Sequence, residues 1–372
     1  VYTIFLNQSG NQTSRPADEG NRNQTGKLGK IYYSLNGGTI ADGALTEYGS
    51  TDYGYTPPTP TKQGYKFAGW SPANIPTGGT GNMLFTAKWE PNTAKLYSGT
   101  ILNIHMKRLA GNSSAYYNTT DTSIVAIQRS NTAPPDYVME DSDYLISSNN
   151  STSKPAYMWY ENGVIKWWSE AEEINAGSSL ENLCYEMQNL TDISGLADWN
   201  TDSVTDMSEM FCHCTELTEL TPLANWKTDK VANMSLMFWE CNQLTNLTPI
   251  THWKTDEVTN MASMFGGCSQ LTDLAPLANW RTDKVIDMSA MFCGCSQLTN
   301  LAPLAYWKTG NVIKIYSMFN DCNQLSDASA INDWDITNVE NFNYMFIHCP
   351  SHPEFTKRSG TWDSNGTFTP TT

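Results

Sequence analysis

The chain has 372 residues, of which 22 are Lys or Arg and 38 are Asp or Glu, so its formal net charge is −16. This acidic balance argues against nucleic-acid binding through phosphates, which needs a basic face. It also disfavours docking on anionic membranes, and no stretch approaches the ~20 apolar residues that span a bilayer. We therefore expect no nucleic-acid partner and no direct membrane insertion.

Apolar residues make up 40% of the chain, which is enough for two or three domains with cores. Only 16% of residues are charged, while Asn, Thr, Ser, Tyr and Trp abound, a composition common in extracellular modules. The chain starts at Val1 without a signal peptide and ends at Thr372 without an anchor. We therefore expect a processed product or a piece of something longer.

Residues 1–90 are predicted to form small β units. Residues 1–30 contain a strand candidate, Val1 to Leu6, followed by an Asn/Gln/Gly-rich loop, and we interpret them as the remnant of a preceding module. Residues 31–90 are predicted to be a separate β module, because NGG and PPTP turn signals separate strands that end in FAGW and FTAKW.

Residues 91–177 are predicted to form a β-rich connecting module. Its clearest signal is the segment 155–168, where Asn162-Gly163 lies between two aromatic-rich alternating runs. Asn-Gly in this setting favours a β-hairpin with a type I′ turn.

Residues 188–349 consist of six units of 27 residues. A fixed period of this length is typical of a solenoid, in which each unit buries its apolar face against its neighbours. Three residue types keep the step throughout, which we call the repeat ladder: Trp199, Trp226, Trp253, Trp280, Trp307 and Trp334; Phe211, Phe238, Phe265, Phe292, Phe319 and Phe346; Cys214, Cys241, Cys268, Cys295, Cys322 and Cys349.

Within a unit we predict a short strand, a tight turn, a capped helix and a return loop. The strand is placed at residues 217–220, stacked in parallel on its equivalents, and Pro222 after it suits the first position of a helical turn. Apolar residues within 231–241 have the spacing of one helix face. Asp229 stands where the N-cap of that helix is expected.

Both ends of the array are predicted to be capped. Residues 178–187 are in phase with the second half of a unit, so we interpret them as an N-terminal half-repeat. Residues 350–372 are interpreted as a C-terminal cap. Gly195 and Ser329 replace the proline in the first and last units, an irregularity that capping units require.

The nine cysteines are predicted to be mainly buried thiols. Six belong to the repeat ladder and leave Cys184, Cys212 and Cys293, an odd total that makes a poor disulfide framework. Equivalent residues of adjacent coils lie ~4.8 Å apart with parallel side chains, a geometry that suits small apolar fillers better than disulfide bonds.

No catalytic or metal-binding motif is recognised. Cys212-His213-Cys214 would need two further ligands to hold zinc, and no CxxC pair complements it. GxSxG, HExxH and phosphate-loop motifs do not occur, and the five histidines have no recognisable catalytic partners. We expect no enzyme activity, no cofactor and no metal.

The tryptophan column has two interpretations. Core packing is favoured, because each Trp follows an apolar position by three residues and its burial stabilises every coil. The alternative is a platform on which a glycan stacks. Four basic residues directly follow tryptophans and are expected to form a solvated, salt-bridged edge, with a recognition stripe for an anionic ligand as the alternative: Lys227, Lys254, Arg281 and Lys308.

Three further positions are candidate binding anchors. Trp239, His252 and Tyr306 break the repeat at places where packing does not dictate identity. Aromatic residues of this kind are frequent anchors in protein interfaces.

The repeat unit resembles a known family. The segment WKTDKVANMSLMFWEC at Trp226–Cys241, with its copies MASMFGGCSQLTDL and MSAMFCGCSQLTNL, is similar to the BspA-like leucine-rich-repeat surface proteins, whose pattern is W-x-T-S-x-V-x-x-M-x-x-M-F-x-x-C. Asp replaces the Ser in four units, and prolines have entered the leucine segment. The likeness runs from the half-repeat to Ser359–Pro370.

A second resemblance covers residues 31–90. The segments LNGGT, YGST, PPTPTKQGYKFAGW and FTAKW, in this order, resemble the Listeria–Bacteroides repeat, a small β-grasp-like module of bacterial cell-wall proteins. Together the resemblances imply a multidomain fold, with small β-rich modules followed by an α/β leucine-rich-repeat-like solenoid of six 27-residue coils. They also imply a secreted or wall-attached bacterial surface protein.

The function implied by the resemblance is adhesion. We expect non-covalent capture of a host extracellular-matrix or cell-surface protein, or of a glycan, by a broad face of the solenoid. Two rival hypotheses stay open: a glycan-binding module that uses the tryptophan column, and a passive stalk or surface-layer component that associates end to end.

Overall fold

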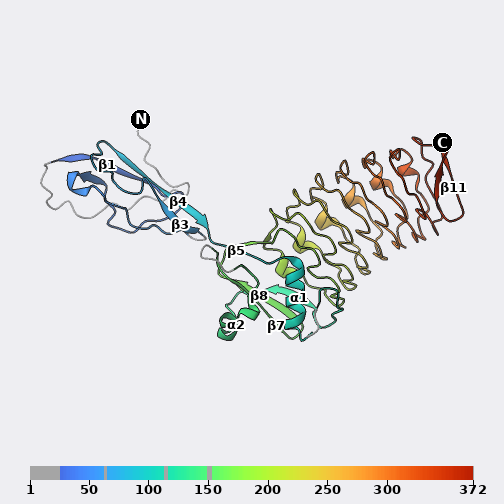
Figure 1. Cartoon of the computed structure of the whole chain (residues 1–372), viewed down its shortest axis with the longest axis horizontal. Coiled ribbons are helices and arrows are strands. Elements are labelled where there is room, and N and C mark those ends of the chain that lie inside the picture. The colour runs from blue at the N-terminus through green and yellow to red at the C-terminus, as the bar shows by residue number, and fades with distance from the viewer. Residues whose placement is uncertain (1–25, 63–64, 113–115, 149–152, 372) are drawn as a thin grey trace. The chain divides into compact units, whose positions relative to one another are not determined.

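The computed structural model describes residues 26–62, 65–112, 116–148 and 153–371, and the strand predicted at Val1 to Leu6 lies outside them. The chain divides into two compact units, with the boundary between Asn92 and Thr93. Each unit has its own hydrophobic core. The fold is therefore multidomain and β-rich, with few helices and with repeated units in its C-terminal part (Figure 1).

The N-terminal unit is a four-stranded sheet with the order β2-β1-β4-β3. Strands β1 and β4 are parallel, and the other two pairs are antiparallel. Trp70 and Phe85 pack edge to face in its core. Asn36 and Gly37 have positive φ, as their turn signal predicts. The elements are β1 (Lys27–Ser34), β2 (Glu47–Gly49), the 3-10 helix η1 (Ser50–Asp52), β3 (Tyr65–Ser71) and β4 (Met83–Pro91).

The C-terminal unit begins with two small sheets and two α-helices. Asn162 and Gly163 have φ of 50° and 88°, so the predicted type I′ hairpin is present between β7 and β8. The sheets have the orders β6-β8-β7 and β10-β9-β5. The elements are β5 (Thr93–Lys95), α1 (Gly99–Leu109), β6 (Ala126–Arg129), α2 (Asp136–Glu140), η2 (Ser142–Tyr144), β7 (Ala156–Glu161), β8 (Val164–Ser169), β9 (Glu173–Asn175) and β10 (Trp199–Asn200).

This N-terminal part of the unit shares one core with the repeats. Leu102 of α1 and Trp167 of β8 belong to the same buried cluster as the repeat ladder. The indole N–H of Trp167 donates to the carbonyl of Gly195, in the first repeat, at 2.9 Å. Residues 93–177 thus belong to the same compact unit as the repeats and share their core.

The predicted helix within each repeat is wrong. Residues 178–371, all of them described, contain no α-helix, and residues 231–241 form successive turns. Some of their backbone N–H groups bond three residues back, as from Val231 to Thr228, while those of Leu236 and Glu240, which have positive φ, donate to the next repeat. Turns that recur every three residues place apolar side chains inward at nearly the spacing of a helix, which explains the error. Asp229 therefore caps no helix.

The first half of each repeat carries a single 3-10 turn. The predicted strand at residues 217–220 belongs to no named strand, but proline occupies the first turn of the following helix as expected. The turns are η3 (Ser194–Leu196), η4 (Thr221–Leu223), η5 (Thr248–Ile250), η6 (Ala275–Leu277), η7 (Ala302–Leu304) and η8 (Ser329–Ile331).

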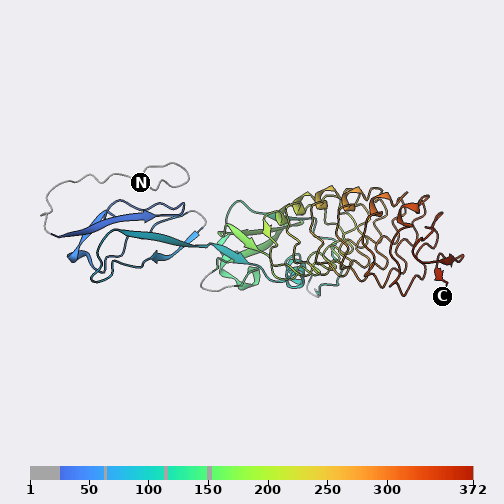
Figure 2. The same cartoon turned by 90° about the horizontal axis from the view of Figure 1, so that it is seen from above.

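Backbone hydrogen bonds join each repeat to the next. The N–H groups of Met207, Glu209, Phe211 and His213 donate to carbonyls 26 residues further on, and the same bonds recur along the array. All these N–H groups point toward the C-terminal neighbour. Without a cap, the N-terminal end of the array would therefore leave carbonyls unpaired, and the C-terminal end would leave N–H groups unpaired. Figures 1 and 2 show the repeats as neighbouring loops around a shared interior.

Helix α1 covers the carbonyl end. The N–H of Gly99 donates to the carbonyl of Ser179, and Thr100 Oγ1 donates to that of Glu181. Asn103 Nδ2 donates to the carbonyls of Leu183 and Tyr185 at 3.3 and 3.1 Å. These four carbonyls are the ones that an earlier repeat would bond.

A hairpin covers the N–H end. Strands β11 (Gly360–Trp362) and β12 (Phe368–Pro370) are antiparallel. In the loop between them, Thr367 Oγ1 accepts the N–H of Tyr344 and the carbonyl of Gly366 accepts that of Phe346, at 2.9 and 3.0 Å. The hairpin loop thus supplies acceptors for the backbone N–H groups of the last repeat.

Candidate binding surface

The tryptophans of the repeat ladder lie inside the array. They are at most 4% exposed. From Trp226 on, their indole N–H groups bond backbone carbonyls 30 residues earlier, as Trp226 bonds Leu196 at 3.0 Å, whereas the indole N–H of Trp199 is buried without a partner among the described residues. The phenylalanines stack in a file, with ring centroids of Phe211 and Phe238 5.7 Å apart and nearly parallel. Neither ring type presents an open face to a ligand.

The ladder cysteines are free thiols that bond the backbone. Cys241 Sγ donates to the carbonyl of Phe211 at 3.2 Å, and the later members repeat this contact. Burial raises the pKa of Cys241 well above its usual range. Cys293, outside the ladder and partly exposed, has a pKa raised by burial to about 11. These thiols are packing groups with little thiolate at neutral pH.

A column of buried threonines bonds the backbone of the residue that follows the tryptophan in the next repeat. Thr228 Oγ1 donates to the carbonyl of Lys254 and accepts the N–H of the same residue, at 2.8 and 2.7 Å. Three equivalent threonines, Thr201, Thr255 and Thr282, do the same. In the last repeat Ile336 stands in this position, and the hydroxyl of Thr309 lacks a partner.

The residues on either side of each tryptophan point outward, because neighbours in an extended segment face opposite sides. His252 and Tyr306 precede their tryptophans, and Tyr306 is 85% exposed. The basic residues that follow are also exposed. We call this surface the tryptophan-flanking face: Asn225, Lys227, His252, Lys254, Asn279, Arg281, Tyr306 and Lys308.

Charge pairing on this face is uneven. Lys227 bonds Asp202 at 2.9 Å and Arg281 bonds Asp283 at 2.8 Å, both in exposed positions. Lys254 and Lys308 have no ion pair within the part of the chain that the structure describes. The expected salt-bridged edge is therefore formed at two of the four basic positions, and two ammonium groups are open to a partner.

Trp239 does not lie on this face. Its half-buried ring covers Gly266 of the next repeat, where an added Cβ would come within 2.2 Å of the ring. The indole thus fills the place of the missing side chain. The structure brings His252 and Tyr306 together with the basic column and places Trp239 elsewhere.

An outward column that we did not predict runs along the turn segments. Its backbone has positive φ at every repeat, which explains the glycines at two of its positions. Glu186 lies 4.0 Å from His213 at one end, and Asp321 lies 2.6 Å from His348 at the other. In the sequence, this column could have been recognised from the glycine that occurs two residues after the ladder phenylalanine in two repeats. The column is Glu186, His213, Glu240, Gly267, Gly294, Asp321 and His348.

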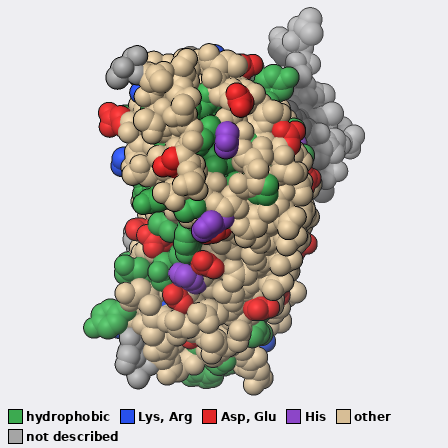
Figure 3. Space-filling model, turned by 90° about the vertical axis from the view of Figure 1, so that its right-hand side faces the viewer, with side chains coloured by type: hydrophobic (Ala, Val, Ile, Leu, Met, Phe, Trp, Pro, Cys, Tyr) green, Lys and Arg blue, Asp and Glu red, His purple; other side chains and the backbone are tan. Residues whose placement is uncertain are grey.

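Among the charged side chains visible in Figure 3, the acidic ones predominate. Asp and Glu side chains are spread over it, His side chains lie in a line between hydrophobic ones, and few Lys or Arg side chains are visible. Within the described residues, no three His, Cys, Asp or Glu side chains are grouped so as to hold a metal ion.

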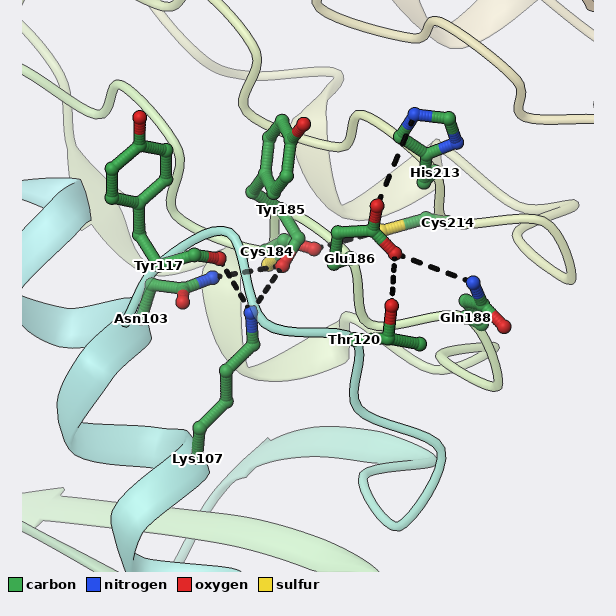
Figure 4. A network of polar contacts seen from close by, with 10 residues as sticks. All are labelled: Asn103, Lys107, Tyr117, Thr120, Cys184, Tyr185, Glu186, Gln188, His213 and Cys214. Carbon is green, nitrogen blue, oxygen red and sulfur yellow. Dashed lines mark hydrogen bonds and ion pairs between the residues drawn. The ribbon is translucent and has the colours of Figure 1, made fainter. Parts of the chain in front are cut away.

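A buried ammonium group lies beneath α1 (Figure 4). Lys107 is fully buried, and its Nζ donates to the carbonyls of Tyr117 and Tyr185 at 2.6 and 2.8 Å. Burial lowers its pKa to about 8, against the opposing attraction of Asp121 and Glu186. Because Tyr185 is one of the edge carbonyls, Lys107 continues the row of donors that closes the array.

These features describe a class of protein: a β-rich array of 27-residue repeats, closed at both ends, that follows a small β unit. Residues 178–275 and 271–368 each match a family model described as "Mycoplasma protein of unknown function, DUF285". These matches cover half of the chain, which belongs to this family. Residues 30–98 match the Listeria-Bacteroides repeat domain. No curated protein and no solved structure matches the chain, and no described helix is long and apolar enough to cross a membrane.

Proposed function

We propose that this chain is a secreted or surface-attached bacterial adhesin of the BspA-like type. Its array would be a leucine-rich-repeat-like solenoid of six coils that captures a host or microbial macromolecule without covalent chemistry. The Listeria-Bacteroides repeat domain, which occurs in surface proteins, supports the location.

The observation that carries the proposal is the separation of the array into a constant interior and a variable exterior. Interior columns repeat the same Trp, Phe and Cys, and both backbone edges are closed. The tryptophan-flanking face instead carries Asn, His and Tyr at equivalent positions. A solenoid that keeps its core and varies an outward face can present that face to a partner.

The open ammonium groups indicate the chemistry of the partner. Lys254 and Lys308 lie one residue beyond tryptophans whose other neighbours are His252 and Tyr306. A face of this composition suits an acidic or hydroxyl-rich surface of a matrix or cell-surface protein, with Tyr306 as the central apolar contact.

The rival hypotheses have less support. The tryptophan column would have to leave the core to stack on a glycan, since its rings are at most 4% exposed. End-to-end assembly of a passive stalk would require unpaired edges, and α1 and the β11–β12 hairpin occupy them.

The test is binding of the full chain to immobilised fibronectin, collagen and mucin, measured by biolayer interferometry. We expect the double variant His252→Ala/Tyr306→Ala to bind one of these at least about tenfold more weakly, and Lys254→Gln/Lys308→Gln to lose its salt dependence. The control is Tyr316→Ala, because Tyr316 is exposed but lies in a turn segment. The proposal would be contradicted if the chain bound none of the three immobilised proteins, or if all variants bound equally well.

A further inference from the structure

The residues before the array form a cleft that the proposed function does not use. It has a volume of about 520 Å³, within the usual range of small-ligand sites. One wall is the loop 130–135 with α2, and the other is the hairpin of β7 and β8 (Figure 1). Its most prominent lining residues are Tyr137, Trp159, Glu161 and Lys166.

One aromatic ring of the cleft is open to solvent. Tyr137 is 60% exposed and is held by edge-to-face packing on Tyr144, with ring centroids 5.9 Å apart. Trp159 also lines the cleft, although its ring is nearly buried. An exposed aromatic ring at a cleft is a feature of a binding site.

The polar part of the cleft carries no net charge. Lys166 Nζ bonds the carboxylate of Glu161 on the neighbouring strand, and both groups remain partly open to solvent. The pair can donate to a ligand hydroxyl and accept from it. A strongly anionic or cationic ligand would have to break the pair, which favours a neutral one.

The walls are stiff before any ligand arrives. Pro134 and Pro135 fix the backbone ahead of α2, and Ser130 Oγ donates to the carbonyl of Thr132 at 2.7 Å. At the base of the loop, Arg129 bonds Asp198 at 3.0 Å and stacks on Trp167. A preformed cleft lowers the entropy cost of binding.

We infer that this cleft binds a neutral saccharide. Sugar rings combine apolar C–H faces, which pack on aromatic rings, with hydroxyls that both donate and accept hydrogen bonds. Tyr137 meets the first requirement, and the Glu161–Lys166 pair meets the second. The site is separate from the tryptophan-flanking face, so each fails or holds independently of the other.

The test uses the full chain with cellotetraose, maltotetraose and chitotetraose, followed by saturation-transfer NMR and calorimetry. We expect one of them to bind, and Tyr137→Ala to weaken that binding about tenfold, as loss of one stacked ring predicts. Tyr116→Ala is the matched control, because Tyr116 is 71% exposed and does not line the cleft, and this variant should bind the sugar as the unmodified chain does.

Three results would overturn the assignment. The first is the absence of binding by all three tetrasaccharides at millimolar concentration. The second is equal binding by Tyr137→Ala and the unmodified chain. The third is binding of decaproline in place of sugar, since aromatic clefts also accept proline-rich peptides.

Discussion

Both ends of the repeat array need partners for backbone groups that have no neighbouring repeat, and the two caps supply opposite kinds of group. At the N-terminal end the backbone exposes carbonyls, and α1 answers with donors from Thr100, Asn103 and Lys107. At the C-terminal end it exposes N–H groups, and the loop at Gly366 and Thr367 answers with acceptors. The polarity of the inter-repeat bonds therefore decides which groups each cap must supply.

The caps also differ in what makes most of their contacts. The backbone of α1 approaches closely at Gly99, where an added Cβ would come within 2.5 Å of the carbonyls of Leu180 and Glu181. The other edge carbonyls are reached by side chains of α1. At the other end the backbone of Gly366 lies directly on the last repeat, and an added Cβ would come within 2.2 Å of Ile347 N. The N-terminal cap should thus be sensitive to the polarity of its side chains, and both caps should be sensitive to volume at their glycines.

The largest effect is expected from Gly366→Ala. The added methyl group overlaps backbone that cannot move aside, so the hairpin must shift and the last repeat should lose about 3 kcal/mol of stability. Hydrogen exchange of the Tyr344 and Phe346 amides would report this loss.

Gly294→Ala is the control for that variant. Gly294 also has positive φ, but its nearest neighbour to a new Cβ lies at 3.5 Å. Only the strain of a left-handed backbone is added there, about 1 kcal/mol. If the two variants exchange alike, close approach does not explain the C-terminal cap.

The next effect tests the polarity of the N-terminal cap. Asn103→Leu keeps the volume but removes both donors, which leaves the carbonyl of Leu183 buried without a partner. We expect a loss of about 2 kcal/mol in urea unfolding. Arg108→Leu, on the exposed side of the same helix, should change stability by less than about 0.5 kcal/mol. Equal losses would mean that α1 acts by packing alone.

The sequence defines the interior of the array more fully than its ends. The 27-residue step indicates which side chains stack, because equivalent residues of neighbouring repeats occupy equivalent places. The repeat period does not distinguish a helix from consecutive three-residue turns, because both bury side chains at similar positions. For this reason residues 231–241 were predicted incorrectly. Lys107 and Gly366 lie outside the period, and nothing in their local sequence marks them as caps.

The surfaces show the same limit. Tyr306 and His252 depart from the repeat, and for that reason the sequence singles them out. Trp239 departs in the same way but fills the space above Gly266 in a neighbouring repeat. Distinguishing an anchor from a filler requires knowing which residue lies one coil further on. The cleft at Tyr137 combines segments without any repeat, and only the folded chain assembles it.

A pH series on Lys107→Met would sharpen the account of the N-terminal cap. The pKa of Lys107 is about 8 when folded and about 10.5 when unfolded, so between these values the unfolded chain binds more protons. Stability due to Lys107 should therefore rise with pH in this window. The unmodified chain should gain roughly 2 kcal/mol over Lys107→Met from pH 7 to pH 10. A constant difference in urea unfolding would show that the ammonium is not buried as described.

The smallest effect compares the two ends within one molecule. Cys349 is partly exposed beside the C-terminal hairpin, whereas Cys184 is fully buried beside α1, where burial raises its pKa. Alkylation followed by mass spectrometry should modify Cys349 roughly tenfold faster. Gly366→Ala should accelerate modification of Cys349 alone, and Asn103→Leu that of Cys184 alone, because each repeat contacts only its neighbours. Simultaneous acceleration of both thiols by either variant would mean that the array opens as one cooperative body and that the caps are not independent.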